Sequence, residues 1–157
     1  MARLADLPEW EREHLLEKGR EAPRFTERHW VTGKPLKERR VAIVTTSGIH
    51  RRTDRPFDFV PGTEYRVIPG DTASGELVMS HVSVNFDRSG FLDDINVVFP
   101  IDRLRELVTA GTVGSVADFH YAFMGAAWPP TRFEERAVEL AGLLRKDRVD
   151  ALLLSPV

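Results

Sequence analysis

The 157-residue sequence is long enough for one domain with a sizeable hydrophobic core. Its 42% hydrophobic and 29% charged residues are typical of a soluble globular protein, and a formal net charge of −2 gives no global attraction to nucleic acid or anionic membranes. The absence of cysteine excludes disulfides, thiolate metal ligands, iron–sulfur clusters and a cysteine nucleophile within these residues.

The first 38 residues are expected to form a helical arm and an irregular connection. Asp6 and Glu9 have the spacing of a capping box, and Gly19 suits the position just after a helix end. This stretch lacks the apolar segment of a secretory signal, and no run along the chain approaches the ~20 apolar residues of a membrane span. We therefore expect a cytoplasmic protein whose arm, residues 1–38, precedes a domain formed by residues 39–157.

The next part of the chain alternates between apolar strands and loops. Residues 41–46 form a nearly continuous β-branched run, which is typical of a strand buried on both faces in a parallel sheet. Residues 49–62 are rich in Arg, Asp and Pro and predict a loop. Further strands are predicted at residues 65–68 and 76–85.

The second half of the chain adds helices to this pattern. Apolar residues at helical spacing predict a helix over residues 101–110, followed by a short strand over residues 113–117. Thr131 and Glu134 have the spacing of a capping box at the start of another amphipathic helix. Residues 150–154 predict a last buried strand. The order favours an α/β fold: a single layered domain with a mainly parallel sheet flanked by helices.

Ligands of such sheets bind beyond the carboxyl ends of the strands. This rule directs attention to residues 47–50, to residues 118–120 and to Ser155, each after a predicted strand. Residues 45–48 could form either an anion cradle or a tight turn that needs glycine. The candidate substrate-binding residues for a small molecule are Ser47, Gly48, His50 and Tyr121.

Three side chains are candidates for catalysis. His81 or His120 could act as a general base oriented by a carboxylate such as Asp87. The same three residues could instead form a set of two histidines and one carboxylate that binds a divalent metal ion. Their spacing matches no short helical metal motif, so a structural role for each histidine stays open.

The chain resembles the glycine/sarcosine/betaine/D-proline reductase selenoprotein B family over roughly residues 40–157. The resemblance rests on the order and spacing of several stretches rather than on one motif. They are Arg40 to Gly48, Ser80-His81 with Asn85 to Asp87, Phe99 to Leu107 running on to Gly114, Asp118 to Tyr121, and Val149 to Leu154.

The resemblance implies a reductase that cleaves a carbon–nitrogen bond in a small amine, with a selenolate or thiolate as nucleophile and a dithiol as reductant. In this family the reactive selenium or sulfur follows the strand that corresponds to residues 150–154. Here Ser155 stands at that place, and a serine hydroxyl is neither acidic enough nor redox active. The chain alone is therefore expected not to perform the thiol or selenol step, and a thiol-bearing protein partner would supply it.

Two alternatives stay open beside this interpretation. One is an enzyme of a different reaction type that uses His81 and His120 with a carboxylate, with or without a metal. The other is a non-catalytic binding or assembly subunit that forms a homo-oligomer, with the N-terminal arm contributing to the contacts.

Overall fold

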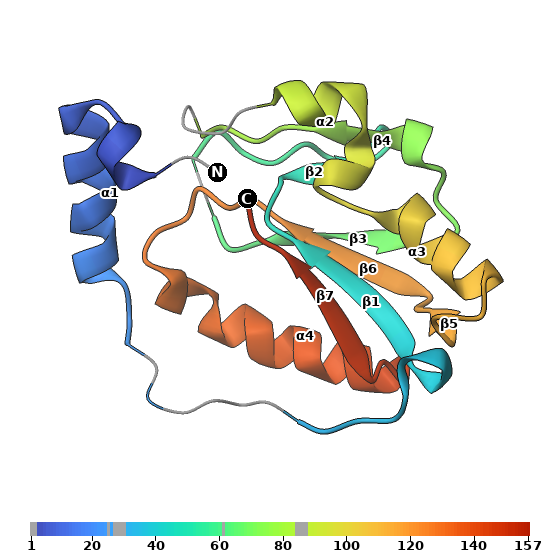
Figure 1. Cartoon of the computed structure of the whole chain (residues 1–157). Coiled ribbons are helices and arrows are strands. Elements are labelled where there is room, and N and C mark those ends of the chain that lie inside the picture. Colours follow the sequence, from blue (N-terminus) through green and yellow to red (C-terminus); the bar gives the residue numbers. More distant parts are fainter. Residues whose placement is uncertain (1–2, 25, 27–30, 61, 84–87) are drawn as a thin grey trace.

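A mixed, mostly parallel sheet of five strands organises the chain, with β1 at its centre (Figure 1). β1 pairs in parallel with β5 and β6 along one edge and with β7 along the other, and β3 runs antiparallel to β6. The strands are β1 Arg40–Thr45, β3 Tyr65–Pro69, β5 Ser115–Val116, β6 Phe119–Phe123 and β7 Ala151–Ser155. This computed structural model describes residues 3–24, 26, 31–60, 62–83 and 88–157.

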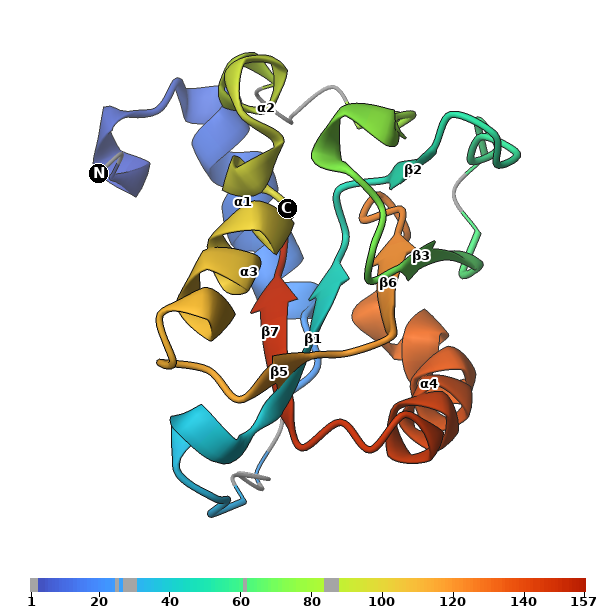
Figure 2. The ribbon, with the colours of Figure 1, turned by 90° about the vertical axis from the view of Figure 1, so that its right-hand side faces the viewer.

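Among the described residues, a two-stranded antiparallel ribbon and four α-helices accompany the sheet. The sheet lies between α3 and α4 (Figure 2). α1 stands apart from the sheet as an arm (Figure 1). The ribbon consists of β2 Ile49–Arg51 and β4 Leu77–Met79, and the helices are α1 Glu9–Glu21, α2 Ser89–Asp93, α3 Ile101–Thr109 and α4 Glu134–Lys146. None of the helices in the described part has the length and apolar character that crossing a bilayer requires.

The hydrophobic core has one part on each face of the sheet, because successive residues of a strand point to opposite faces. Ile43 of β1 packs with Phe99 and Leu104 on the face covered by α3. Its neighbour Ala42 packs with Tyr121 and with Leu140 on the face covered by α4. The alternation of side chains in β1 therefore links both halves of the core.

The predicted fold class is confirmed, as are several of its elements. β1, β3 and α3 lie within one residue of the predicted bounds, and the strand predicted at residues 150–154 is present as β7, shifted by one residue. The predicted strand over residues 76–85 is shorter, since β4 ends at Met79 and residues 84–85 lie outside the described part. Within the predicted loop of residues 49–62, residues 49–51 form β2, because they pair with β4 across a distance in sequence.

Both predicted capping boxes are wrong. α1 begins after Pro8 rather than at Asp6, and it continues through Gly19 to Glu21. α4 follows directly from a 3-10 turn that already contains Thr131, so no side chain caps its first turn. Each helical segment instead begins directly after a proline, Pro8 or Pro129, and proline is favoured at helix starts.

Residues 118–120 do follow a strand, β5, but Phe119 and His120 already belong to the next strand. The short strand β5 ends at Val116, and the chain then enters β6 at Phe119. His120 therefore lies inside a strand rather than beyond its carboxyl end. This arrangement arises because β5 and β6 share one partner: β5 pairs with the start of β1, and β6 pairs with its end.

Candidate functional site

The turn after β1 is held by hydrogen bonds among its own side chains. Thr45 Oγ1 donates to Ser47 Oγ over 3.0 Å, and the Ser47 N–H donates to Thr45 Oγ1 over 3.2 Å. Gly48 follows with φ of 68°, and its N–H donates to the Phe123 carbonyl over 2.8 Å. A side chain at Gly48 would be strained, and its Cβ would lie 3.1 Å from His81 Cα. The turn therefore needs glycine for backbone conformation and for close approach.

His81 packs against this turn. The Ser80 N–H donates to the Gly48 carbonyl over 3.0 Å, which holds the following residue beside the glycine. The buried His81 ring accepts a hydrogen bond at Nδ1 from the Ser83 N–H over 3.1 Å. Burial, reinforced by the positive charge of Arg88, lowers the pKa of His81 below its ordinary value. At neutral pH the ring is therefore uncharged, with its proton on Nε2.

The residues that follow β7 lie on the other side of the same turn. The Thr46 N–H donates to the Ser155 carbonyl over 3.2 Å, and the Val157 N–H donates to Thr46 Oγ1 over 2.8 Å. The Gly125 N–H donates to the Thr46 carbonyl over 2.8 Å, and a Cβ there would lie 2.9 Å from that oxygen. The carboxyl ends of three parallel strands thus meet here, where the label C marks the chain end (Figure 1).

We call residues 46–48, His81 and residues 155–157 the strand-end site. Two of the predicted places, Ser47-Gly48 and Ser155, meet in this site, as the rule for open α/β sheets implies. His81 joins them because the β2–β4 ribbon brings its segment back to Gly48. Sequence periodicity gave no sign of that ribbon pairing.

His50 lies two residues beyond the turn, in β2. Its Nδ1 lies 2.8 Å from the Arg51 carbonyl oxygen, and the ring packs edge-on against Phe57. A carbonyl oxygen only accepts, so Nδ1 donates the proton and the neutral ring keeps its lone pair at Nε2. His50 is buried, and its bond at Nδ1 leaves Nε2 as an acceptor. His81 and His120 differ, because each accepts a hydrogen bond at Nδ1.

His120 is fully buried inside β6. Its Nδ1 accepts the Ile43 N–H over 2.9 Å, and its ring packs edge-on against Phe99. Burial, with a further contribution from the charge of Arg105, lowers the pKa of His120 to about 4. The neutral ring carries its proton on Nε2, which has no hydrogen-bond partner among the described residues. In this arrangement His120 can donate a proton to a hydrogen bond, and acting as a base would require breaking its bond to Ile43.

Tyr121 lies in the part of the core beneath α4. Its ring packs edge-on against Tyr65 with 5.6 Å between ring centroids, and only 2% of its surface is exposed. Burial, followed by the charge of Asp147, raises the pKa of its phenol. These contacts describe a packing role, and binding of substrate by Tyr121 stays a prediction.

The proposed metal set includes Asp87, which lies outside the described residues. Among residues 3–24, 26, 31–60, 62–83 and 88–157, no group of three or more histidine, aspartate or glutamate side chains is arranged to hold a metal ion. The set formed by His81, Asp87 and His120 therefore stays a prediction. His81 and His120 lie on different elements, one after β4 and the other within β6.

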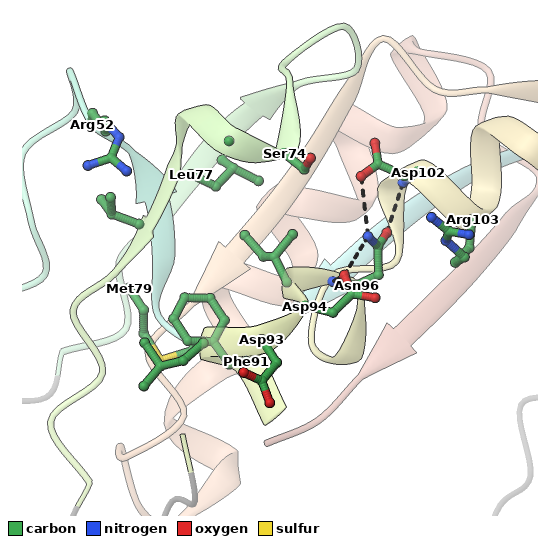
Figure 3. A pocket seen from close by; sticks show the side chains of 14 residues that line it. Arg52, Ser74, Leu77, Met79, Phe91, Asp93, Asp94, Asn96, Asp102 and Arg103 are labelled. Carbon is green, nitrogen blue, oxygen red and sulfur yellow. Dashed lines mark hydrogen bonds between the residues drawn. The ribbon is translucent and has the colours of Figure 1, made fainter. Parts of the chain in front are cut away.

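A large open pocket lies beside the β2–β4 ribbon, where the sequence predicted no site. Its volume is about 880 Å³, and its walls come from β4, α2 and the start of α3 (Figure 3). The residues that line it are Arg52, Ser74, Gly75, Leu77, Val78, Met79, Phe91, Leu92, Asp93, Asp94, Ile95, Asn96, Asp102 and Arg103. The lining thus combines two arginines and three aspartates with apolar side chains of β4 and α2.

Most carboxylates of this pocket already have structural partners. Asn96 Nδ2 donates to Asp94 Oδ1 over 2.8 Å and to Asp102 Oδ2 over 3.2 Å (Figure 3). Hydrogen bonds from Asn96 lower the pKa of Asp94. Burial opposes ionisation of Asp102, but bonds from Asn96, Ser74 and Arg105 outweigh it and lower the pKa. These hydrogen bonds fix the junction of α2 and α3. Asp94 and Asp102 are therefore already engaged within the protein.

Comparison with known proteins places these features in a family. Residues 29–156 match the family model described as glycine/sarcosine/betaine reductase selenoprotein B. The chain is 37% identical over 123 residues to D-proline reductase subunit gamma of Acetoanaerobium sticklandii, an alignment that covers 78% of this chain and 50% of that protein. It is 26% identical over 126 residues to betaine reductase complex component B subunit beta of Peptoclostridium acidaminophilum, which covers 78% of this chain and 29% of that protein.

A third relative has the same level of similarity. Sarcosine reductase complex component B subunit beta of Peptoclostridium acidaminophilum is 26% identical over 126 residues, covering 78% of this chain and 29% of that protein. The chain therefore spans half the length or less of these curated relatives. No solved structure matches it.

Proposed function

The chain belongs to the glycine/sarcosine/betaine reductase selenoprotein B family, and we propose that it is an oxidoreductase-related subunit of that kind. In this role it binds a small amino acid or amine at the strand-end site, and a protein partner supplies the thiol or selenol. The observation that carries the proposal is the family match over residues 29–156, supported by 37% identity to a D-proline reductase subunit.

The need for a partner's thiol or selenol follows from the side chains present in this chain. The 157 residues contain no cysteine, so no thiolate among them can attack carbon or be reoxidised by a dithiol. Ser155 is the last residue of β7, at the place where the resemblance puts the family's reactive atom, and its hydroxyl has neither the acidity nor the redox chemistry that the step needs. A thiol or selenol from a second chain is therefore part of the proposal.

The geometry of the strand-end site supports it as the place where the substrate and the partner's thiol or selenol would react. The Ser155 carbonyl is hydrogen-bonded to Thr46, so a nucleophile delivered beside Ser155 would stand next to the turn that ends at Gly48. Arg88 brings a positive charge to the same place, since its Nη2 donates to the His81 carbonyl over 2.7 Å. A guanidinium is suited to bind the carboxylate that amino-acid substrates carry.

The test is calorimetric titration of the purified chain with D-proline, betaine, sarcosine and glycine, followed by a turnover assay with excess dithiothreitol. We expect binding of at least one of these ligands and no cleavage product until a thiol- or selenol-bearing partner is added. His81→Asn keeps an acceptor for the Ser83 N–H but removes the imidazole, and we expect about tenfold weaker binding.

The control is His14→Ala, which changes an exposed histidine on α1 and should leave binding unchanged. Turnover by the chain with dithiothreitol alone would contradict the claim that a protein partner must supply the thiol or selenol. Absence of binding for all four ligands, in a chain shown to be folded by circular dichroism, would contradict a substrate site at the strand ends.

A further inference from the structure

The open edge of β7 is apolar on both faces. Among the described strands β7 pairs with β1 alone, and Leu152, Leu153 and Leu154 are 47%, 40% and 64% exposed. The sequence predicted a buried strand here, and the structure contradicts that burial for the isolated chain. Free edges of natural sheets usually carry charges, prolines or bulges that block further pairing, and residues 151–155 contain none of these.

An uncharged groove accompanies this edge on the face covered by α4. Its volume is about 420 Å³, and no residue that lines it carries a charge. Leu140 and Leu144 of α4 form one wall, and Leu152 and Leu154 of β7 form another. Leu153 points to the opposite face, because it pairs with Ile43 while its neighbours pair with Ala42 and Val44. Strand edge and groove together leave apolar surface exposed on both sides of β7.

The residue pattern of β7 is nearly symmetric about Leu153. If β7 pairs antiparallel with a second β7 around a twofold axis at Leu153, then Leu152 stands opposite Leu154 of the copy, and Ala151 stands opposite Ser155. Side chains opposite each other share one face of a sheet, so the leucines that line the groove in one chain would meet those of the other. No charged residue meets a charge of the same sign in this register.

We propose that β7 is a self-association surface, through which two copies of this chain form one continuous sheet by antiparallel β7–β7 pairing centred on Leu153. The charges of α4 fit the same axis. Its first turn carries Glu134 and Glu135, and its last turn carries Arg145 and Lys146. A twofold axis reverses one α4 relative to the other, so the acidic end of each helix lies at the same end of the assembly as the basic end of its copy.

A cysteine placed at the axis tests this geometry directly. The wild-type chain has no cysteine, so any disulfide formed by Leu153→Cys joins two chains. Directly opposed antiparallel residues have Cα atoms about 4.5–5.5 Å apart, which is within the range that a disulfide spans. We expect Leu153→Cys to form covalent dimers under mild oxidation, at least about tenfold faster than Val138→Cys. Val138 is the matched control, because it is 76% exposed on α4 and does not line the groove.

Sedimentation velocity of the full chain gives the second measurement. The wild type and Val138→Arg should sediment as dimers, whereas Leu153→Arg should sediment as a monomer whose circular dichroism is unchanged. A monomeric wild type overturns the proposal. Equal cross-linking rates for the two cysteine variants overturn it as well, since they would place any dimer contact away from β7.

Discussion

His120 is a titratable side chain that is fully removed from water. Its ring is fully buried in β6, its Nδ1 accepts the Ile43 N–H, and its pKa is lowered to about 4. The buried site disfavours the charged ring, because burial removes the water that solvates an imidazolium. His120 therefore makes folding sensitive to pH independently of any part it plays in function.

The direction of this effect follows from the two pKa values. The unfolded ring has the ordinary value near 6.5, so between pH 6.5 and 4 the unfolded chain binds a proton that the folded chain does not. Stability is fully present above pH 6.5 and falls as the pH drops through this window, by up to about 3 kcal/mol from His120. Urea unfolding measured from pH 7.5 to 4 should show this loss.

A matched variant separates His120 from other groups. His120→Asn keeps a side-chain acceptor for the Ile43 N–H but does not titrate, so its stability should depend less on pH over the same window. His81 also has a lowered pKa and contributes in the same direction in both proteins. If His120→Asn and the wild type lose equal stability between pH 6.5 and 4, the buried neutral state assigned to His120 is wrong.

At the scale of elements, a partly buried ion pair joins the end of α4 to the start of β1. Arg40 Nη2 lies 2.6 Å from Asp147 Oδ1, and the other Asp147 oxygen accepts the Asp118 N–H over 2.8 Å and the Phe119 N–H over 3.2 Å. The Asp147 side chain is 7% exposed. Burial opposes the charge on Arg40, but hydrogen bonds to Asp147 and Asp118 outweigh it and raise its pKa. One carboxylate thus connects α4, β1 and the start of β6.

Removing the Asp147 carboxylate should lower the free energy of unfolding. Asp147→Ala leaves Arg40 without its nearest anion and leaves two backbone N–H groups without their acceptor, so we expect a loss of about 3 kcal/mol in the free energy of unfolding. Asp58→Ala is the control, because it removes an exposed ion pair with Arg55 and should cost less than about 0.5 kcal/mol. Chemical denaturation measures both, and a similar cost for the two variants would contradict the connecting role of Asp147.

At the scale of the whole molecule, α1 is weakly attached to the rest of the structure. It contains no buried residue, and Lys18 and Glu21 near its end contact Trp128 of the sheet domain. Glu21 accepts a hydrogen bond from the Trp128 indole over 3.0 Å, and Lys18 lies 4.9 Å from the ring centroid. Exposed contacts of this kind contribute little to stability.

Deletion of residues 1–31 should therefore leave a folded sheet domain. We expect the free energy of unfolding to change by less than about 1 kcal/mol, with one cooperative transition in urea. A longer deletion that also removes Leu36 to Arg40 should abolish folding, since it takes the Leu36 carbonyl from Gly114 and Arg40 from Asp147. Loss of cooperative unfolding in the shorter variant would show that the arm is part of the folded unit.

Sequence periodicity predicted the regular elements well where local pattern and burial agree. The apolar run at β1 and the helical spacing in α3 both lie in the core, so their patterns match their structures. β6 was missed because β5 and β6 are close in sequence and pair with different parts of the same strand. β5 pairs with the start of β1, and β6 pairs with its end. β2 and its pairing with β4 were missed, because β2 is three residues long and is defined by its partner.

The sequence by itself determined the fold class, the order of the main elements, the family and the absence of a thiol. These follow from periodicity, composition and residue order, which are local properties of the chain. Only the tertiary structure placed His81 against Gly48, enclosed His120 within the sheet and left the leucines of β7 exposed. Contacts between distant segments decide these features, because burial and strand pairing depend on which surfaces meet rather than on neighbouring residues.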